Sequence, residues 1–109
     1  MRLGNILWTL AVVTPIALVA GCSYQVHRFE RSFETTKDGD SLQTVIERFG
    51  NPDVRETNAE LFARYASIRC AAPCEARLWW EHPVLKGMEA WSVEFSSGHV
   101  IHKGHWVSP

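Results

Sequence analysis

The sequence lacks a marked excess of charge of either sign. Its 109 residues include 11 Lys or Arg and 12 Asp or Glu, so the formal net charge at pH 7 is −1. A nucleic-acid-binding protein would need a basic patch and a positive balance, so this class of function is excluded. The chain is also too short for more than one domain, and a domain of this size buries only about 60% of its unfolded surface. Little volume remains for an internal ligand cavity, and we expect function on the surface.

No apolar stretch is long and continuous enough to cross a membrane comfortably. The longest one runs from Ile6 to Ala20 and is interrupted by Pro15 and two threonines. It follows a short N-terminus that carries one positive side chain, Arg2. A buried or amphipathic first helix is disfavoured because the stretch is apolar on every face. A charged residue, an apolar stretch and small residues, in that order, indicate an export signal peptide over residues 1–21.

The residues that end this signal are more specific. Val19-Ala20-Gly21-Cys22 resembles the lipobox of bacterial lipoproteins, which has an apolar residue, two small residues and a cysteine. The resemblance implies cleavage before Cys22, diacylation of its thiol and acylation of the new amino group. Several acyl chains anchor a protein firmly, at about 0.8 kcal/mol per buried methylene. Ser23 stands where an aspartate would retain such a protein in the inner membrane, so we expect a bacterial outer-membrane protein whose domain faces the periplasm.

Cysteine is scarce, and its number supports the same prediction. Three cysteines are an odd number for an exported protein, but lipid on Cys22 would leave one pair, Cys70 and Cys74. Disulfides persist in an oxidising compartment. The spacing is not that of a thioredoxin-like redox motif, which has two intervening residues, and no second pair completes a zinc site. We therefore predict a disulfide that holds a short loop, with a redox or a metal-binding role as the alternatives.

The polarity of the chain divides it into three parts. Residues 1–21 are the signal peptide, residues 22–37 are polar and mixed in charge, and residues 38–109 contain the regular patterns of a folded domain. Polar segments near a terminus are often disordered. Residues 22–37 are therefore predicted to form a tether that lifts the domain off the bilayer.

One helix is predicted from Asp40 to Phe49, because its apolar residues recur every three or four positions. Asp40 or Ser41 caps its start, and Gly50 stops it. Residues 58–68 carry a second stripe of this kind, so a helix is favoured there, with an irregular strand as the alternative. The two stripes consist of Leu42, Val45, Ile46 and Phe49, and of Leu61, Phe62, Tyr65 and Ile68.

The C-terminal third alternates apolar and polar residues, as half-buried strands do. Strands are predicted over residues 77–81 and 91–96, and Ser97-Gly98 joins the second strand to a third as a tight hairpin. Helices on one face of this sheet give an α+β two-layer sandwich, with one or two N-terminal helices packed on a three-stranded antiparallel meander. The pairs expected across the hairpin are Phe95 with Val100 and Val93 with His102.

The segment from Gly39 to Pro52 matches the pattern G-x-[ST]-x3-V-x3-[LF]-G-x-P. It resembles the SmpA/OmlA family of small outer-membrane lipoproteins, which includes the BamE-like accessory subunits of the β-barrel assembly machine. The resemblance implies a lipid-anchored α+β domain that binds envelope proteins during β-barrel assembly. It covers roughly residues 38–103 and continues through Leu78-Trp79-Trp80, Trp91 to Phe95 and Gly98-His99-Val100.

Three histidines, His99, His102 and His105, are candidate metal ligands. On a regular strand His99 and His102 would point to opposite faces, and His99 and His105 would be about 20 Å apart. One metal ion could not join them, so no metal site is predicted. No Ser-His-Asp arrangement or carboxylate pair is suggested by the spacing either. We therefore expect no catalytic residues, no cofactor and no enzyme activity.

The tryptophans divide between two faces of the predicted sheet. Trp79 has the opposite parity to the core-facing set, with Arg77 beside it and Ile101 on the same face. An exposed tryptophan next to an arginine is typical of protein-contact surfaces. The candidates for a partner surface are therefore Arg77, Trp79 and Ile101, within a rim of Glu81, Glu94 and Lys103, unless the tether or the tail covers them. The core-facing set is Trp80, Trp91 and Phe95.

These features predict a non-enzymatic lipoprotein of the outer membrane that binds an envelope protein, with β-barrel assembly as its process. The alternative is a structural envelope lipoprotein that contacts peptidoglycan or lipid and has no role in barrel assembly.

Overall fold

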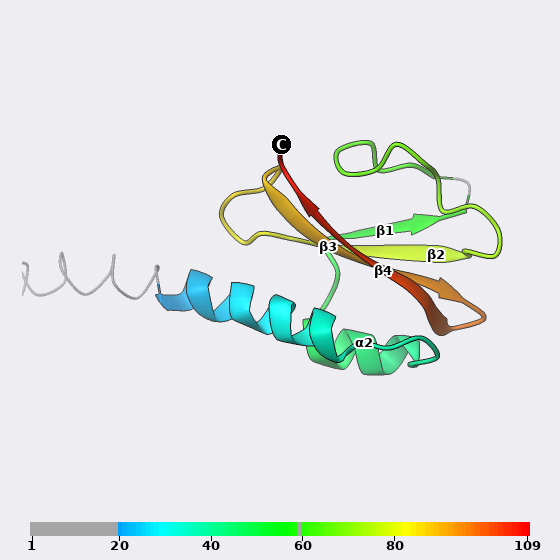
Figure 1. Ribbon diagram of the computed structural model, residues 1–109, viewed down its shortest axis with the longest axis horizontal. Helices are drawn as coiled ribbons and strands as arrows, with labels where there is room; N and C mark the ends of the chain where they lie inside the picture. The colour runs from blue at the N-terminus through cyan, green and yellow to red at the C-terminus, as the bar shows by residue number, and fades with distance from the viewer. Residues whose placement is uncertain (1–19, 59) are drawn as a thin grey trace, which may run out of the picture.

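The fold is a four-stranded antiparallel sheet with two helices on one face. The computed structural model describes residues 20–58 and 60–109. One helix runs through residues 20–35, and α2 spans Leu42–Phe49. Figure 1 shows both helices beneath the sheet, which confirms the α+β two-layer sandwich and adds one strand to the predicted three. The strands lie side by side in chain order: β1 (Val54–Thr57), β2 (Ala76–Glu81), β3 (Glu89–Ser96) and β4 (His99–Val107).

The signal peptide predicted for residues 1–21 lies outside the described residues, apart from its last two. Cys22 falls within the first described helix, where it is half-buried. Among the described residues, no helix combines the length and the hydropathy of a membrane span.

The tether predicted for residues 22–37 is wrong, because the first helix packs against the domain. Val26, Phe29 and Phe33 are three and four residues apart and so share one helical face. Phe29 is buried, and its ring centre lies 5.1 Å from that of Trp91. The polar residues between these positions are mostly exposed, so the helix is amphipathic and belongs to the folded domain.

α2 forms where the apolar stripe predicted it. Ser41, one of the two predicted caps, accepts a hydrogen bond from the backbone N–H of Thr44 at 3.2 Å. Gly50 ends the helix with φ at 90°, a conformation that glycine adopts without strain. The ring of Phe49 stacks on Trp80 with 4.3 Å between ring centres, so the helix is fixed on the middle of the sheet.

The aromatic residues predicted to face the helices do so. Trp80, Trp91 and Phe95 are buried between the two layers. The Trp80 indole N–H donates to the carbonyl of Gly50 at 3.0 Å, so its one polar atom is satisfied inside the core. The remaining buried members of this core are Phe29, Val45, Phe49, Leu78, Val93 and Val100.

The hairpin between β3 and β4 turns at Ser97 and Gly98, as predicted, with both φ angles positive. Phe95 pairs with Val100, which confirms the first expected pair. The second is wrong, because the register shifts between Glu94 and Phe95 and Val93 pairs with Lys103. This shift is a β-bulge on β4, which has one residue more than β3 at this point, so every β4 residue beyond it changes faces relative to a regular hairpin.

Residues 58 and 60–68, the described part of the second apolar stripe, do not form the favoured helix. Most of the segment is irregular, and it runs over the sheet face opposite the helices, where Figure 1 shows it in green above β1 and β2. Two of its four stripe residues, Leu61 and Ile68, are exposed rather than buried, so the stripe does not mark a packed face. We call residues 60–74 the covering segment.

Candidate functional site

The covering segment hides the surface that the sequence offered as a partner site. Arg77, Trp79 and Glu81 lie on the sheet face away from the helices, as predicted, but they are buried. Trp79 keeps only 4% of its surface exposed, and its ring lies 5.3 Å from that of Tyr65 in the covering segment. Tyr65 also contacts Trp106 of β4 at 4.9 Å. In this conformation neither Arg77 nor Trp79 is available to a partner.

A buried carboxylate, Glu56 of β1, organises the first half of this covered face. Arg77 donates to its two oxygens at 2.9 and 3.0 Å, in the two-pronged geometry that guanidinium and carboxylate groups favour. The indole N–H of Trp79 donates to the same carboxylate, and so does the backbone N–H of Phe62 at 2.7 Å. The covering segment is thus joined to β1 and β2 through one side chain.

The pKa of the Glu56 carboxyl lies below its ordinary value. Burial alone would raise this pKa, but the hydrogen bonds that the carboxylate accepts, the one from Arg77 first, outweigh the burial. Glu56 is therefore ionised at neutral pH and paired with Arg77 in the interior.

A second carboxylate, Glu81 at the end of β2, holds the other half of the segment. Arg64 donates to it at 2.8 Å, and the phenol of Tyr65 donates to the same oxygen. Burial raises the pKa of Tyr65, and its hydrogen bond to Glu81 raises it further, so the phenol keeps its proton as the donor. The Tyr65 oxygen in turn accepts from the backbone N–H of Gly87 at 3.0 Å.

The disulfide lies where the covering segment ends. Cys70 and Cys74 are bonded, with 5.2 Å between their α-carbons, and both are buried. Close by, Arg77 donates to the carbonyl of Ile68 at 2.9 Å, which ties the segment to β2 just before the disulfide. The bond therefore orders the return of the chain into the sheet. Cys22 is the one free cysteine of the described residues.

The bulge redistributes the side chains that the sequence placed on β4. Lys103 faces the helices, not the rim of a free face, and its ammonium lies 4.5 Å from the ring centre of Phe33. Ile101 is the additional, unpaired residue of the bulge on β4 and is half-buried. The third candidate for the partner surface therefore does not extend a patch with Arg77 and Trp79.

The histidines are redistributed in the same way. His99 and His102 pair with Ser96 and Glu94 and so share the face away from the helices, whereas His105 stacks on Trp91 with 5.3 Å between ring centres. The parity predicted for His99 relative to the other two is thus reversed. Within residues 20–58 and 60–109, no three His, Cys, Asp or Glu side chains converge as metal ligands would.

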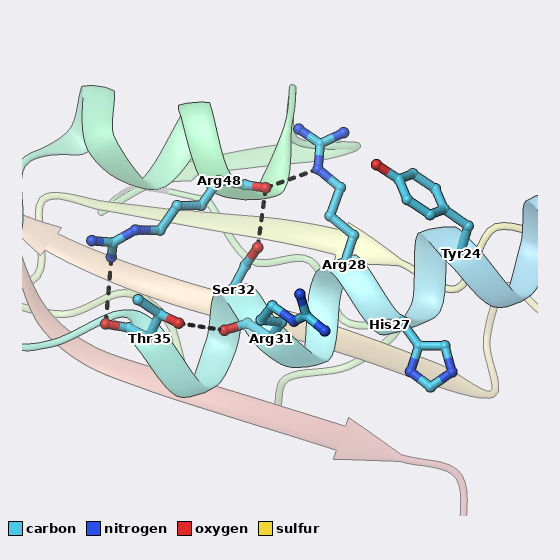
Figure 2. A pocket seen from close by; sticks show the side chains of 7 residues that line it. All are labelled: Tyr24, His27, Arg28, Arg31, Ser32, Thr35 and Arg48. Carbon is cyan, nitrogen blue, oxygen red and sulfur yellow. Dashed lines mark hydrogen bonds between the residues drawn. The ribbon is translucent and has the colours of Figure 1, made fainter.

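A groove that the sequence did not reveal lies between the first helix and α2. It encloses about 380 Å³ and is shown in Figure 2. Arg28 reaches across it and donates to the carbonyl of Arg48 at 2.9 Å, and Ser32 donates to the same oxygen at 3.0 Å. Cationic side chains from both helices line the groove. Its members are Tyr24, His27, Arg28, Arg31, Ser32, Thr35 and Arg48.

Exposed apolar side chains gather at one end of the sheet, in the connector between β2 and β3 and at the end of β4. We call Val84, Leu85, Met88 and Val107 the end patch; each keeps more than half of its surface exposed. The backbone N–H of Ser108 donates to the carbonyl of Met88 at 2.8 Å, which brings Val107 beside the connector. In Figure 1 the connector lies toward the end of the molecule at which the first helix begins.

No family model, no curated protein and no solved structure matches this chain. The resemblance of residues 38–103 to the SmpA/OmlA family therefore stays a prediction. The groove and the end patch are surface features that were not predicted from the sequence.

Proposed function

We propose that this chain is a non-enzymatic bacterial lipoprotein, anchored in the outer membrane by lipid on Cys22, that binds an envelope protein during β-barrel assembly. The observation that carries the proposal is Val19-Ala20-Gly21-Cys22 after an apolar stretch and a positive N-terminus. The pairing of Cys70 with Cys74 supports it, because Cys22 is then the one thiol free to accept lipid.

The first helix determines how such an anchor would present the domain. Cys22 precedes the buried Phe29 by seven residues, which corresponds to about 10 Å along a helix. A lipid on Cys22 would therefore hold the domain close to the bilayer surface. The end patch and the groove would then lie toward the membrane side of the domain.

Maturation is tested by the intact mass of protein extracted from membranes. We expect loss of residues 1–21 and the added mass of acyl chains on Cys22. Cys22→Ser should give uncleaved precursor without acyl mass, whereas the control Cys70→Ser should be processed like the wild type. Wild-type protein in the membrane fraction with an unmodified Cys22 would rule out the proposal.

The partner surface that we propose in place of Trp79 is the end patch. Apolar side chains that gather on an exposed surface mark sites of contact with proteins or membranes. A photo-crosslinking residue at Leu85 in intact cells should capture an envelope protein, whereas one at the exposed Glu60 on the covering segment should not. Deletion of the protein should also lower porin levels and sensitise cells to large apolar antibiotics.

The structural-lipoprotein alternative remains a second candidate, because the groove brings several cationic side chains to the side of the domain nearest Cys22. Crosslinks from Leu85 to lipid alone, with unaltered porins and permeability, would favour this candidate over a role in barrel assembly.

A further inference from the structure

We propose that the groove between the first helix and α2 binds a phosphate group, carried by an anionic lipid headgroup or free in solution. Three arginines line it and no acidic side chain does. Arg28 and Arg31 come from the first helix, and Arg48 comes from the last turn of α2.

The charges of the groove are only partly compensated. Arg48 donates to Asp40 at 2.8 Å. The hydrogen bond from the backbone N–H of Lys37, and after it the one from Arg48, lower the pKa of Asp40. One positive charge is thus matched by one negative charge. Neither Arg28 nor Arg31 has an acidic partner among the described residues, so two positive charges remain for an incoming anion.

Arg28 is held in place before any ligand arrives. Its Nε–H donates to the Arg48 carbonyl at 2.9 Å, and a second nitrogen lies 3.5 Å from the Glu47 carbonyl. These two carbonyls belong to the C-terminal end of α2, where a cation is favoured by the helix dipole. Figure 2 shows the hydroxyl of Tyr24 beside this guanidinium, on the side away from the Arg48 carbonyl. Part of the ordering cost of binding has therefore already been met by the fold.

Arg31 supplies the adjustable arm. It lies three residues after Arg28, so both leave the same side of the helix, and it is exposed. A planar guanidinium with several N–H groups matches the oxygens of a phosphate better than a lysine ammonium does. Tyr24 and His27, one turn earlier, add a hydroxyl and an imidazole to the lining.

The position of the groove favours a lipid headgroup as the source of the phosphate, and this step rests on the acylation of Cys22. Arg28 and Arg31 follow Cys22 by six and nine residues, about 9 and 13 Å along the helix. Basic residues so close to an anchor lie at the level of anionic headgroups and are attracted to them.

The test is an NMR titration of the ¹⁵N-labelled protein extracted in maltoside micelles, following the side-chain Nε–Hε signals of the arginines. Inorganic phosphate is added in one series. In a second series the micelles are doped with phosphatidic acid, and in a third with diacylglycerol, which has the same tails and no phosphate. Arg31→Gln removes the adjustable arm, and Arg69→Gln is the matched control, because Arg69 is exposed in the covering segment on the other side of the sheet.

We expect saturable shifts of the Arg28 and Arg31 signals with phosphatidic acid and none with diacylglycerol. Affinity should fall at least tenfold in Arg31→Gln and stay within twofold of the wild type in Arg69→Gln. Saturation with inorganic phosphate alone would support the site and assign it to a soluble phosphate. Absence of shifts in both phosphate series, or equal affinity in Arg31→Gln, would overturn it.

The acyl mass of Cys22, measured on the same sample, separates this inference from the proposed function. If Cys22 is acylated and no phosphate binds, the phosphate site is rejected and the lipid anchor stands. If phosphate binds and Cys22 is unmodified, the phosphate site stands and the lipid anchor is rejected.

Discussion

The two faces of the sheet are covered in different ways. On one face two helices bury a continuous apolar core that includes Phe29, Phe49, Trp80 and Trp91. On the other face an irregular segment lies over a smaller cluster, two buried carboxylates connect it to the strands, and a disulfide closes a loop at its end. The helix face depends on apolar packing, and the covered face depends on polar contacts that are specific to individual residues.

The difference follows from where the backbone N–H and C=O groups of each covering element find their hydrogen-bond partners. A helix pairs its N–H and C=O groups internally, so its side chains are free to pack. An irregular segment has to find partners for its backbone elsewhere. The backbone N–H of Phe62 donates to the carboxylate of Glu56, and the backbone carbonyl of Ile68 accepts from Arg77. We therefore expect the helix face to carry global stability and the covering segment to open separately.

The largest effect is expected from Phe49→Ala on the helix face. Phe49 is fully buried and stacked on Trp80, so its loss leaves a cavity and should lower the free energy of unfolding by about 3–5 kcal/mol. Urea denaturation followed by circular dichroism measures it. Ile68→Ala is the control, because Ile68 is 73% exposed, and it should stay within about 0.5 kcal/mol of the wild type. A loss below about 1 kcal/mol for Phe49→Ala would contradict the role given to the helix face.

Glu56→Gln should have the next largest effect, about 2–3 kcal/mol, because it leaves the buried guanidinium of Arg77 without its counter-charge. The same urea titration measures it, and the exposed Glu60→Gln should change little. If Glu56→Gln equals Glu60→Gln, the polar contacts do not hold the covering segment.

How much of this comparison could be predicted from the sequence depends on the range of the interactions. α2, the Ser97-Gly98 turn and the inward parity of Trp80 are local patterns, and each is confirmed. The first helix was also encoded locally, in the spacing of Val26, Phe29 and Phe33, but the many charged residues around them concealed it.

The covered face could not be predicted, because its contacts join residues that are far apart in the chain. β1 contains one polar residue that is buried, Glu56, and what stabilises its charge there is Arg77, 21 residues later. The bulge on β4 has no glycine to mark it at Ile101, so His102, Lys103 and His105 were predicted on the wrong faces of the sheet. Arg28 and Arg31 could have been singled out only once the first helix was known.

The pH dependence should distinguish the faces further. The pKa of Glu56 is lowered in the folded state, so the unfolded chain takes up a proton first, and stability falls as the pH drops below about 4.5 and through the folded pKa. Each unit of lowering corresponds to about 1.4 kcal/mol. The pKa of Asp40 is lowered too, but this side chain lies at the surface and should contribute little to the pH dependence of stability.

Urea titrations between pH 3 and 7 check this prediction. The wild type should lose stability over the acid range, and Glu56→Gln should lose markedly less. Parallel pH curves for the two proteins would mean that another carboxyl causes the acid sensitivity.

Opening the disulfide should have the smallest global effect. The bond joins residues only four apart, so by chain entropy its loss should cost at most about 2 kcal/mol. Cys70→Ser with Cys74→Ser should instead increase proteolytic cleavage within the covering segment. Global unfolding at room temperature after this double substitution would show that the bond supports the whole domain.

Residue-resolved hydrogen exchange of the wild type and of Glu56→Gln tests most directly whether the two faces are held independently. We expect the amide of Phe62 and its neighbours in the covering segment to exchange through local opening, with less protection than the amides that pair β2 with β3. In Glu56→Gln the covering segment should lose most of its protection, while the β2–β3 amides, reduced by the global loss of about 2–3 kcal/mol, stay the better protected. Equal protection of the covering segment and of the β2–β3 pairing in both proteins would contradict this account, because the sheet and its cover would then unfold as one unit.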